Sequence, residues 1–138
     1  MRIRKAALAV VAAVCMAAPA LAHHSFAMFD PNKRTTWTGT VVSFRWANPH
    51  TFIVIEVPRT AEHPELAGRW AIEGGSPNIM SRQGWRRNSF HVGDAITIVG
   101  YPLRDGTKGG SLYYAIDGDG NRLYHDVNRD GGPAAGGA

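Results

Sequence analysis

Apolar and polar residues alternate with a period of two along most of this chain, and this alternation restricts its fold more than any other feature. A period of two places successive side chains on opposite faces of a β-strand, whereas a helix needs a period near 3.6. The alternating segments are also rich in β-branched and aromatic residues, which favour strands. They cover Trp37–Arg45, Thr51–Val57, Arg69–Glu73, Ala95–Tyr101 and Ser111–Ile116, with a short extension at Arg122–His125. The sequence therefore predicts a mostly β protein.

One short helix is expected between the third and fourth strands. Ser76 suits the N-cap, Pro77 the first helical position and Gly84 the left-handed residue that ends a helix. Three strands, a short helix and two more strands is the order of a small OB-like five-stranded β-barrel. Gly39 suits the sharp bend that the first strand of such a barrel needs. An open β-sandwich fragment has the same strand count and stays open as the alternative.

The N-terminus has the three parts of a cleavable export signal. A basic stretch, Arg2–Lys5, precedes the apolar run Ala6–Met16, and Ala20-Leu21-Ala22 is a small-x-small cleavage site. The apolar run is shorter than the roughly 20 residues that a membrane-spanning helix needs. We therefore expect a periplasmic or secreted protein that starts at His23, with no membrane span after processing.

Processing would leave one domain without cysteine. The expected division is a signal peptide at 1–22, an N-terminal arm at 23–35, an OB-like barrel at 36–127 and a disordered Gly/Ala-rich tail at 128–138. Three of the 15 basic residues lie in the signal against 11 acidic residues in the rest, so the net charge falls from +4 to +1. A nearly neutral domain outside the cytoplasm is not expected to bind nucleic acid.

Several short motifs recur in order along the processed chain. They are Ala22-His23-His24-Ser25-Phe26, Phe29-Asp30, Gly39-Thr40-Val41, Trp46 with Asn48-Pro49-His50, Trp70 with Glu73 and Ser76-Pro77-Asn78, Gly84-Trp85, Gly93-Asp94, and Gly100-Tyr101 with Asp105-Gly106. Together they resemble the bacterial family catalogued as domain of unknown function 6152. The resemblance implies an exported OB-like domain without an assigned activity. Met80 stands where the resemblance leads us to expect leucine.

Histidine supplies the candidate metal ligands. If cleavage follows Ala22, the free α-amine and the ring Nδ1 of His23 lie on one residue and can chelate a metal ion together. His50 at the barrel rim is the candidate third nitrogen, and His24 is the alternative. A planar set of nitrogen donors favours Cu(II). The sequence thus leads to a copper-binding hypothesis, and Zn(II) stays open as the alternative metal.

The same histidines also have an interpretation that involves no metal ion. Two histidines beside a processing site can be a solvated tail, and His50 can simply bond to a loop carbonyl. The three other histidines, His63, His91 and His125, are expected at the surface.

No catalytic constellation is recognisable, so the sequence gives no reason to expect an enzyme. Cysteine is absent after processing, and the serines lack the sequence context of a nucleophile. Glu56 and Glu73 are expected to face solvent or to pair with Arg45 and Arg69.

The alternative function is a non-enzymatic accessory module. It would dock a periplasmic protein partner or a small ligand through an aromatic and basic barrel face. The residues proposed for that face are Trp85, Arg82, Arg86 and Arg87.

Overall fold

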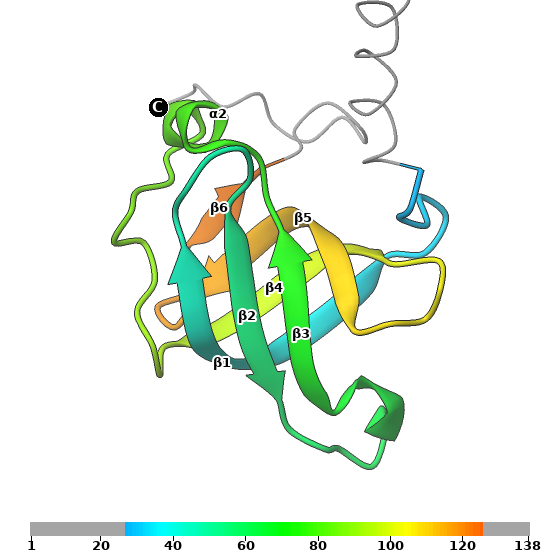
Figure 1. Cartoon of the computed structure of the whole chain (residues 1–138). Helices are drawn as coiled ribbons and strands as arrows, with labels where there is room; N and C mark the ends of the chain where they lie inside the picture. Colours follow the sequence, from blue (N-terminus) through cyan, green and yellow to red (C-terminus); the bar gives the residue numbers. More distant parts are fainter. Residues whose placement is uncertain (1–26, 126–138) are drawn as a thin grey trace, which may run out of the picture.

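Strand β1 (Thr35–Arg45) pairs with a different neighbour at each of its two ends. Its first half, from Thr35 to Thr40, pairs with β4 (Ala95–Pro102), and its second half, from Thr40, pairs with β2 (Phe52–Val57). A strand shared in this way makes the sheet curl on itself. These elements belong to a computed structural model that describes residues 27–125 (Figure 1).

The barrel is closed by two further strands. Strand β3 (Gly68–Glu73) pairs with β2 in antiparallel fashion and with β5 (Gly109–Asp117) in parallel, while β5 also pairs with β4. A short strand, β6 (Arg122–Tyr124), extends the sheet beyond β5. The result is a closed five-stranded barrel with the OB strand order, which confirms the predicted fold and excludes the open sandwich fragment.

Helix α2 (Pro77–Arg82) lies between β3 and β4, as the sequence predicts. The Ser76 side chain accepts a hydrogen bond from the Ile79 amide, and Gly84 has a φ of +92°. Figure 1 shows α2 at the end of the barrel where β1 connects to β2 and where β3 ends. This end is called the rim below. Among the described residues, no helix is long and apolar enough to cross a membrane.

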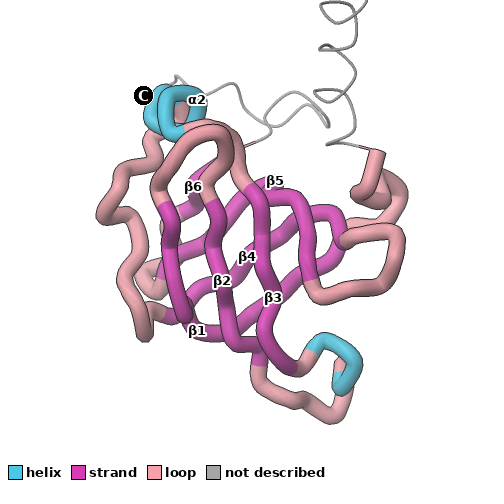
Figure 2. The backbone as a smooth tube through the Cα atoms, viewed as in Figure 1, coloured by secondary structure: helices cyan, strands magenta, loops and turns pink. Residues whose placement is uncertain are grey.

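The segment between β2 and β3 holds an element that the sequence did not indicate. A single 3-10 turn, η2 (Pro64–Leu66), forms within this polar stretch. Figure 2 shows it at the end of the barrel opposite α2. The Trp70 indole N–H donates to the Leu66 carbonyl oxygen over 2.7 Å, and this bond ties the turn to β3.

The core fills the barrel, and β2 and β3 each contribute alternate side chains to it. In β2 the buried residues are Ile53, Ile55 and Val57, and in β3 they are Trp70 and Ile72. Met80, Trp85 and Phe90, from α2 and the segment after it, close the rim end of this core. A second small cluster lies apart from the main core, where Phe29 packs with residues of β4 and β5. The N-terminal arm is anchored there, because the Asp30 amide donates to the Pro102 carbonyl oxygen over 2.9 Å.

Candidate functional site

The connection from β1 to β2 places His50 at the rim. It contains a cis peptide bond between Asn48 and Pro49. Directly after it, the Thr51 amide donates to the Gly75 carbonyl oxygen and the Gly74 amide donates to the Thr51 carbonyl oxygen, each over 2.9 Å. These two bonds hold the start of β2 against the end of β3. His50 is therefore fixed beside the segment that follows Glu73.

His50 and Glu73 form a close pair. Nδ1 of His50 lies 2.6 Å from Oε1 of Glu73 and 3.3 Å from the Gly74 carbonyl oxygen. The side chains are 36% and 19% exposed, so solvent reaches the imidazole more than the carboxylate. Both neighbours of Nδ1 are acceptors, so in the neutral imidazole Nδ1 carries the proton and Nε2 the lone pair. The pair thus presents one oriented nitrogen donor.

Of the two glutamates expected to face solvent or to pair with Arg45 and Arg69, Glu56 has such a partner and Glu73 does not. Oε2 of Glu56 accepts a bond of 3.0 Å from Nε of Arg69 across β2 and β3. Glu73 pairs with His50 instead. Arg45 stacks its guanidinium over the Phe52 ring, 4.9 Å from the ring centre. The difference arises because Glu73 is the last residue of its strand and meets the loop histidine.

A second histidine lies at the same rim. His125 follows β6, and its Nδ1 lies 2.9 Å from Oε1 of Gln83. The Gln83 side-chain amide donates to the His125 carbonyl oxygen, and the His125 amide donates to the Tyr113 carbonyl oxygen over 2.8 Å. His125 is half-buried and held in place, which corrects the expectation that it is an exposed residue.

One small cavity brings these groups together. Its volume is about 40 Å³, and it is lined by Phe29, His50, Glu73, Gly74, Gly75, Ser111 and His125. That volume accommodates one or two water molecules or a single ion, and it is too small for an organic ligand. Among residues 27–125, no three His, Cys, Asp or Glu side chains form a group that could hold a metal ion.

His23 and His24, together with the expected signal peptide and the tail 128–138, lie outside the described residues. His63 and His91 are both exposed, as expected, and they pair with Glu65 and Asp94 at 3.2 Å and 3.6 Å.

The residues proposed for partner binding divide into one buried and three exposed side chains. Trp85 is 0% exposed, and its indole N–H donates to the Tyr124 carbonyl oxygen over 2.9 Å. Its ring therefore belongs to the core and offers no stacking surface. Arg82, Arg86 and Arg87 are exposed, and Arg86 donates to the Ser81 and Trp85 carbonyl oxygens. A docking surface there would consist of guanidinium groups, and it stays a prediction.

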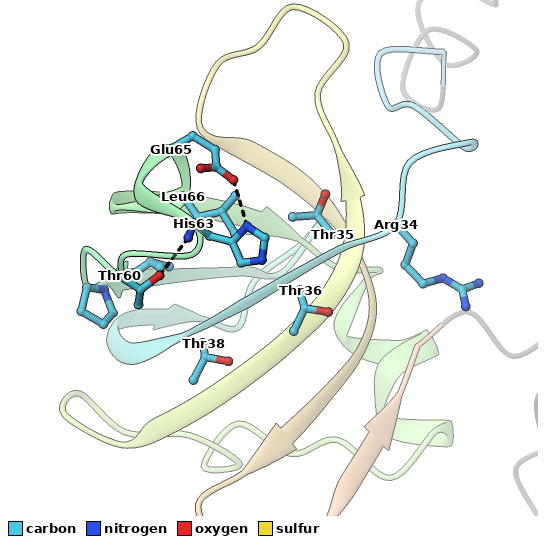
Figure 3. Close-up of a pocket in the computed structure, with 10 residues that line it drawn as sticks. Arg34, Thr35, Thr36, Thr38, Thr60, His63, Glu65 and Leu66 are labelled. Carbon is cyan, nitrogen blue, oxygen red and sulfur yellow. Dashed lines mark hydrogen bonds and ion pairs between the residues drawn. The ribbon is translucent and has the colours of Figure 1, made fainter.

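A larger cleft lies away from the rim, between the first half of β1 and the segment that carries η2. Its volume is about 660 Å³, and Figure 3 shows Thr36 and Thr38 facing it from β1, with His63 and Glu65 on the other side. The backbone amide of Glu65 and the His63 ring lower the pKa of the Glu65 carboxyl group. Arg34 lines one end, and its guanidinium lies 4.6 Å from the centre of the Tyr113 ring. Threonine hydroxyl groups line most of the β1 side of this cleft, and His63 is the histidine among its lining residues.

The sequence profile of a family of unknown function, DUF6152, matches residues 10–112. This range covers well over half of the chain. The chain belongs to this family. Neither a curated protein nor a solved structure was found to match the sequence. The DUF6152 range includes His50, Glu73 and α2, whereas His125 lies beyond it.

Sequence reasoning identified His50 as a site residue but did not predict that Glu73 and His125 line the same cavity. Phe52 and Glu73 are register partners across β2 and β3. A histidine two residues before β2 and a glutamate at the end of β3 could therefore have been paired from the strand boundaries. His125 had no such signal, because its place depends on β6 and on Gln83, 42 residues earlier in the chain.

Proposed function

We propose that this protein is exported, is cleaved after Ala22, and binds Cu(II) at the barrel rim. The α-amine and ring of His23 would supply two nitrogen donors, and Nε2 of His50 the third. The observation that carries the proposal is the His50–Glu73 pair, 2.6 Å apart, in a rim cavity of ionic size.

The Glu73 carboxylate supports the assignment of His50 as a ligand. Metal-binding histidines commonly donate their second ring N–H to a carboxylate or a backbone carbonyl, which fixes the ring and makes the ligand nitrogen more basic. His50 has both kinds of acceptor at Nδ1. The carboxylate also supplies a negative charge near the cation without occupying a coordination position.

The position of Phe29 supports the contribution of the N-terminus. Phe29 lines the same cavity as His50, and it lies six residues after His23. Six residues reach at most about 20 Å. A segment of this length is long enough for the α-amine of His23, or the ring of His24 as the alternative ligand, to reach His50.

The donor set favours copper. An amine and two imidazoles form a nitrogen-rich site, and Cu(II) has the highest affinity of the common divalent first-row metals for such donors. The proposal is a binding function and includes no reaction.

The test is titration of Cu(II) into protein whose N-terminus has been verified by intact mass, compared with the same protein after acetylation of the His23 α-amine. Acetylation removes the amine as a donor, so we expect the copper dissociation constant to rise at least tenfold. We also expect affinity in the processed protein to fall below pH 6.5, because protonated imidazole binds no metal. Equal affinity of the two proteins, or an exported protein that starts elsewhere than His23, would overturn the proposal.

A further inference from the structure

The first half of β1 has one main-chain edge that faces the larger cleft. Among residues 27–125, the strands that pair with β1 are β4, at residues 35–40, and β2, from Thr40 onward. We infer that the edge left open before Thr40 binds an extended peptide segment of another protein, which adds a strand to the barrel beside β1. The η2 segment across the cleft lies at the end of the barrel opposite α2 (Figure 2), so the inference is independent of the rim.

The direction of the main-chain groups in this half follows from Val41. The Val41 amide donates to the Asp94 carbonyl oxygen over 2.9 Å, and the Val41 carbonyl oxygen accepts from the Gly93 amide over 2.8 Å. Asp94 directly precedes β4, so the main chain of Val41 points toward β4. Neighbouring residues of an antiparallel strand alternate in this direction, so the N–H and C=O groups of Thr36 and Thr38 point toward the cleft.

A proline accounts for the end of β2 before this edge. Thr40 is the register partner of Glu56, so the same register would place Thr38 opposite Pro58. Proline has no N–H and cannot donate to the Thr38 carbonyl oxygen. Strand β2 ends at Val57, and the chain turns into the segment that carries η2. The sequence itself therefore encodes the open edge.

The cleft beside this edge suits one extended chain. Its volume of about 660 Å³ is that of a ligand-binding site. The five residues 35–39 span about 17 Å in extended form. Figure 3 shows Thr36 and Thr38 on one side of the cleft and the η2 segment on the other. Because the cleft has walls on both sides, a single peptide strand fits it better than the edge of a second barrel.

The walls indicate the side chains of such a peptide. Val57 and Leu66 line the cleft with apolar surface. The Glu65 backbone amide and the His63 ring lower the pKa of the Glu65 carboxyl group, so this wall carries a negative charge at neutral pH. Arg34 bonds to the Tyr101 hydroxyl, and Figure 3 shows its side chain directed away from Glu65. The favoured peptide therefore combines apolar residues with a basic residue that faces Glu65.

The first test uses a synthetic peptide with blocked ends and the sequence Val-Thr-Lys-Thr-Val. Titration with this peptide should shift the backbone amide NMR signals of Thr36 and Thr38, and saturation should slow their hydrogen exchange at least about tenfold. The Thr51 amide at the rim should not change, because it already bonds to the Gly75 carbonyl oxygen. Unchanged signals of Thr36 and Thr38 at millimolar peptide would overturn the inference.

Methylated versions of the peptide test whether binding uses the main chain. An extended peptide bonds to a neighbouring strand through alternate amides on one of its edges. Methylation of the amides on one edge should preserve binding through the other edge, and methylation of both edges should abolish it. Equal binding of the doubly methylated peptide would contradict strand addition.

The variant Thr36→Pro tests the edge in the protein, with Thr36→Val as its matched control. Proline removes the N–H that faces the cleft and leaves the bonds to β4 intact. We expect Thr36→Pro to lose at least about tenfold in peptide affinity, whereas Thr36→Val, which keeps the N–H, should bind as the wild type does. Wild-type affinity in folded Thr36→Pro protein would exclude the proposed edge.

Two further outcomes identify the occupant. Glu65→Gln should weaken binding of the lysine peptide and leave a peptide with glutamine in place of lysine unaffected; equal loss or no loss would contradict the basic residue. Without peptide, protection of the Thr36 and Thr38 amides should not depend on protein concentration. Protection that rises with concentration would mean that a second copy of the chain fills the edge, and the inference of a partner peptide would fail.

Discussion

Gly39 lies where β1 passes from β4 to β2, and the absence of a side chain there lets two strands approach closely. Gly39 pairs with Ile96 of β4, and the next residue, Thr40, pairs with both β2 and β4. A Cβ atom at residue 39 would overlap the Glu56 carbonyl oxygen. The sequence indicated a bend at Gly39. The structure adds that the glycine is required for close backbone approach.

We predict that Gly39→Ala destabilises the barrel by about 1–3 kcal/mol, because the backbone of β1 or β2 must move to relieve the overlap. Gly118→Ala is the matched control, since a Cβ there would meet only Ala95 atoms at 3.9 Å. The control should change stability by no more than about 0.5 kcal/mol. Urea unfolding of the two variants makes the comparison, and equal stabilities would contradict the account of Gly39.

The sequence alone predicted only some of the residues of the candidate site. His50 was identified from its place after Pro49 at the end of a strand. Glu56 and Glu73 were expected to face solvent or to pair with Arg45 and Arg69, and the Glu56–Arg69 contact agrees with the second possibility. The pairing of Glu73 with His50 was not among the expected possibilities. That pairing depends on the path of a loop, and periodicity carries no information about loops.

At the scale of elements, the boundaries of the strands and of α2 follow local rules. Alternation located each main strand to within two residues, and Ser76 caps the helix as expected. The turn η2 was missed because its stability comes from a tertiary contact. The Trp70 indole bonds to the last residue of η2, and no local pattern predicts that bond.

The turn between β5 and β6 is organised by one carboxylate. Asp117 accepts hydrogen bonds from the Asn121 side chain, from the Asn121 amide and from the Asp119 amide, at 2.9 to 3.3 Å. These bonds favour the charged form, so they lower the pKa of Asp117 below its usual value. An acid whose pKa is lower in the folded state stabilises the fold above its unfolded pKa of about 3.9, and this contribution is lost as pH falls through the folded pKa.

We therefore predict that Asp117→Asn flattens the fall in melting temperature below about pH 4, relative to the wild type. Near neutral pH the variant should be less stable than the wild type, and the difference should shrink on acidification. Asp119→Asn is the control, because Asp119 contributes its backbone amide to the turn. Identical pH profiles for Asp117→Asn and the wild type would exclude this role of the carboxylate.

At the scale of the whole molecule, closure of the barrel is what assembles the rim. The parallel pairing of β3 with β5 puts Glu73 opposite Ser111, and the antiparallel pairing of β5 with β6 carries His125 to the same end. The order of elements was enough to predict an OB-like barrel. It was not enough to predict the rim cavity, since the cavity combines residues from 29 to 125 whose proximity depends on the complete topology.

The central claim is that the barrel itself contributes a nitrogen ligand at this rim. The most direct test is Cu(II) affinity near pH 7.5 in processed protein carrying His50→Gln, compared with His63→Gln, which alters an exposed histidine paired with Glu65. The account predicts at least a tenfold weaker affinity for His50→Gln and an unchanged affinity for His63→Gln. Wild-type affinity in folded His50→Gln protein would contradict it.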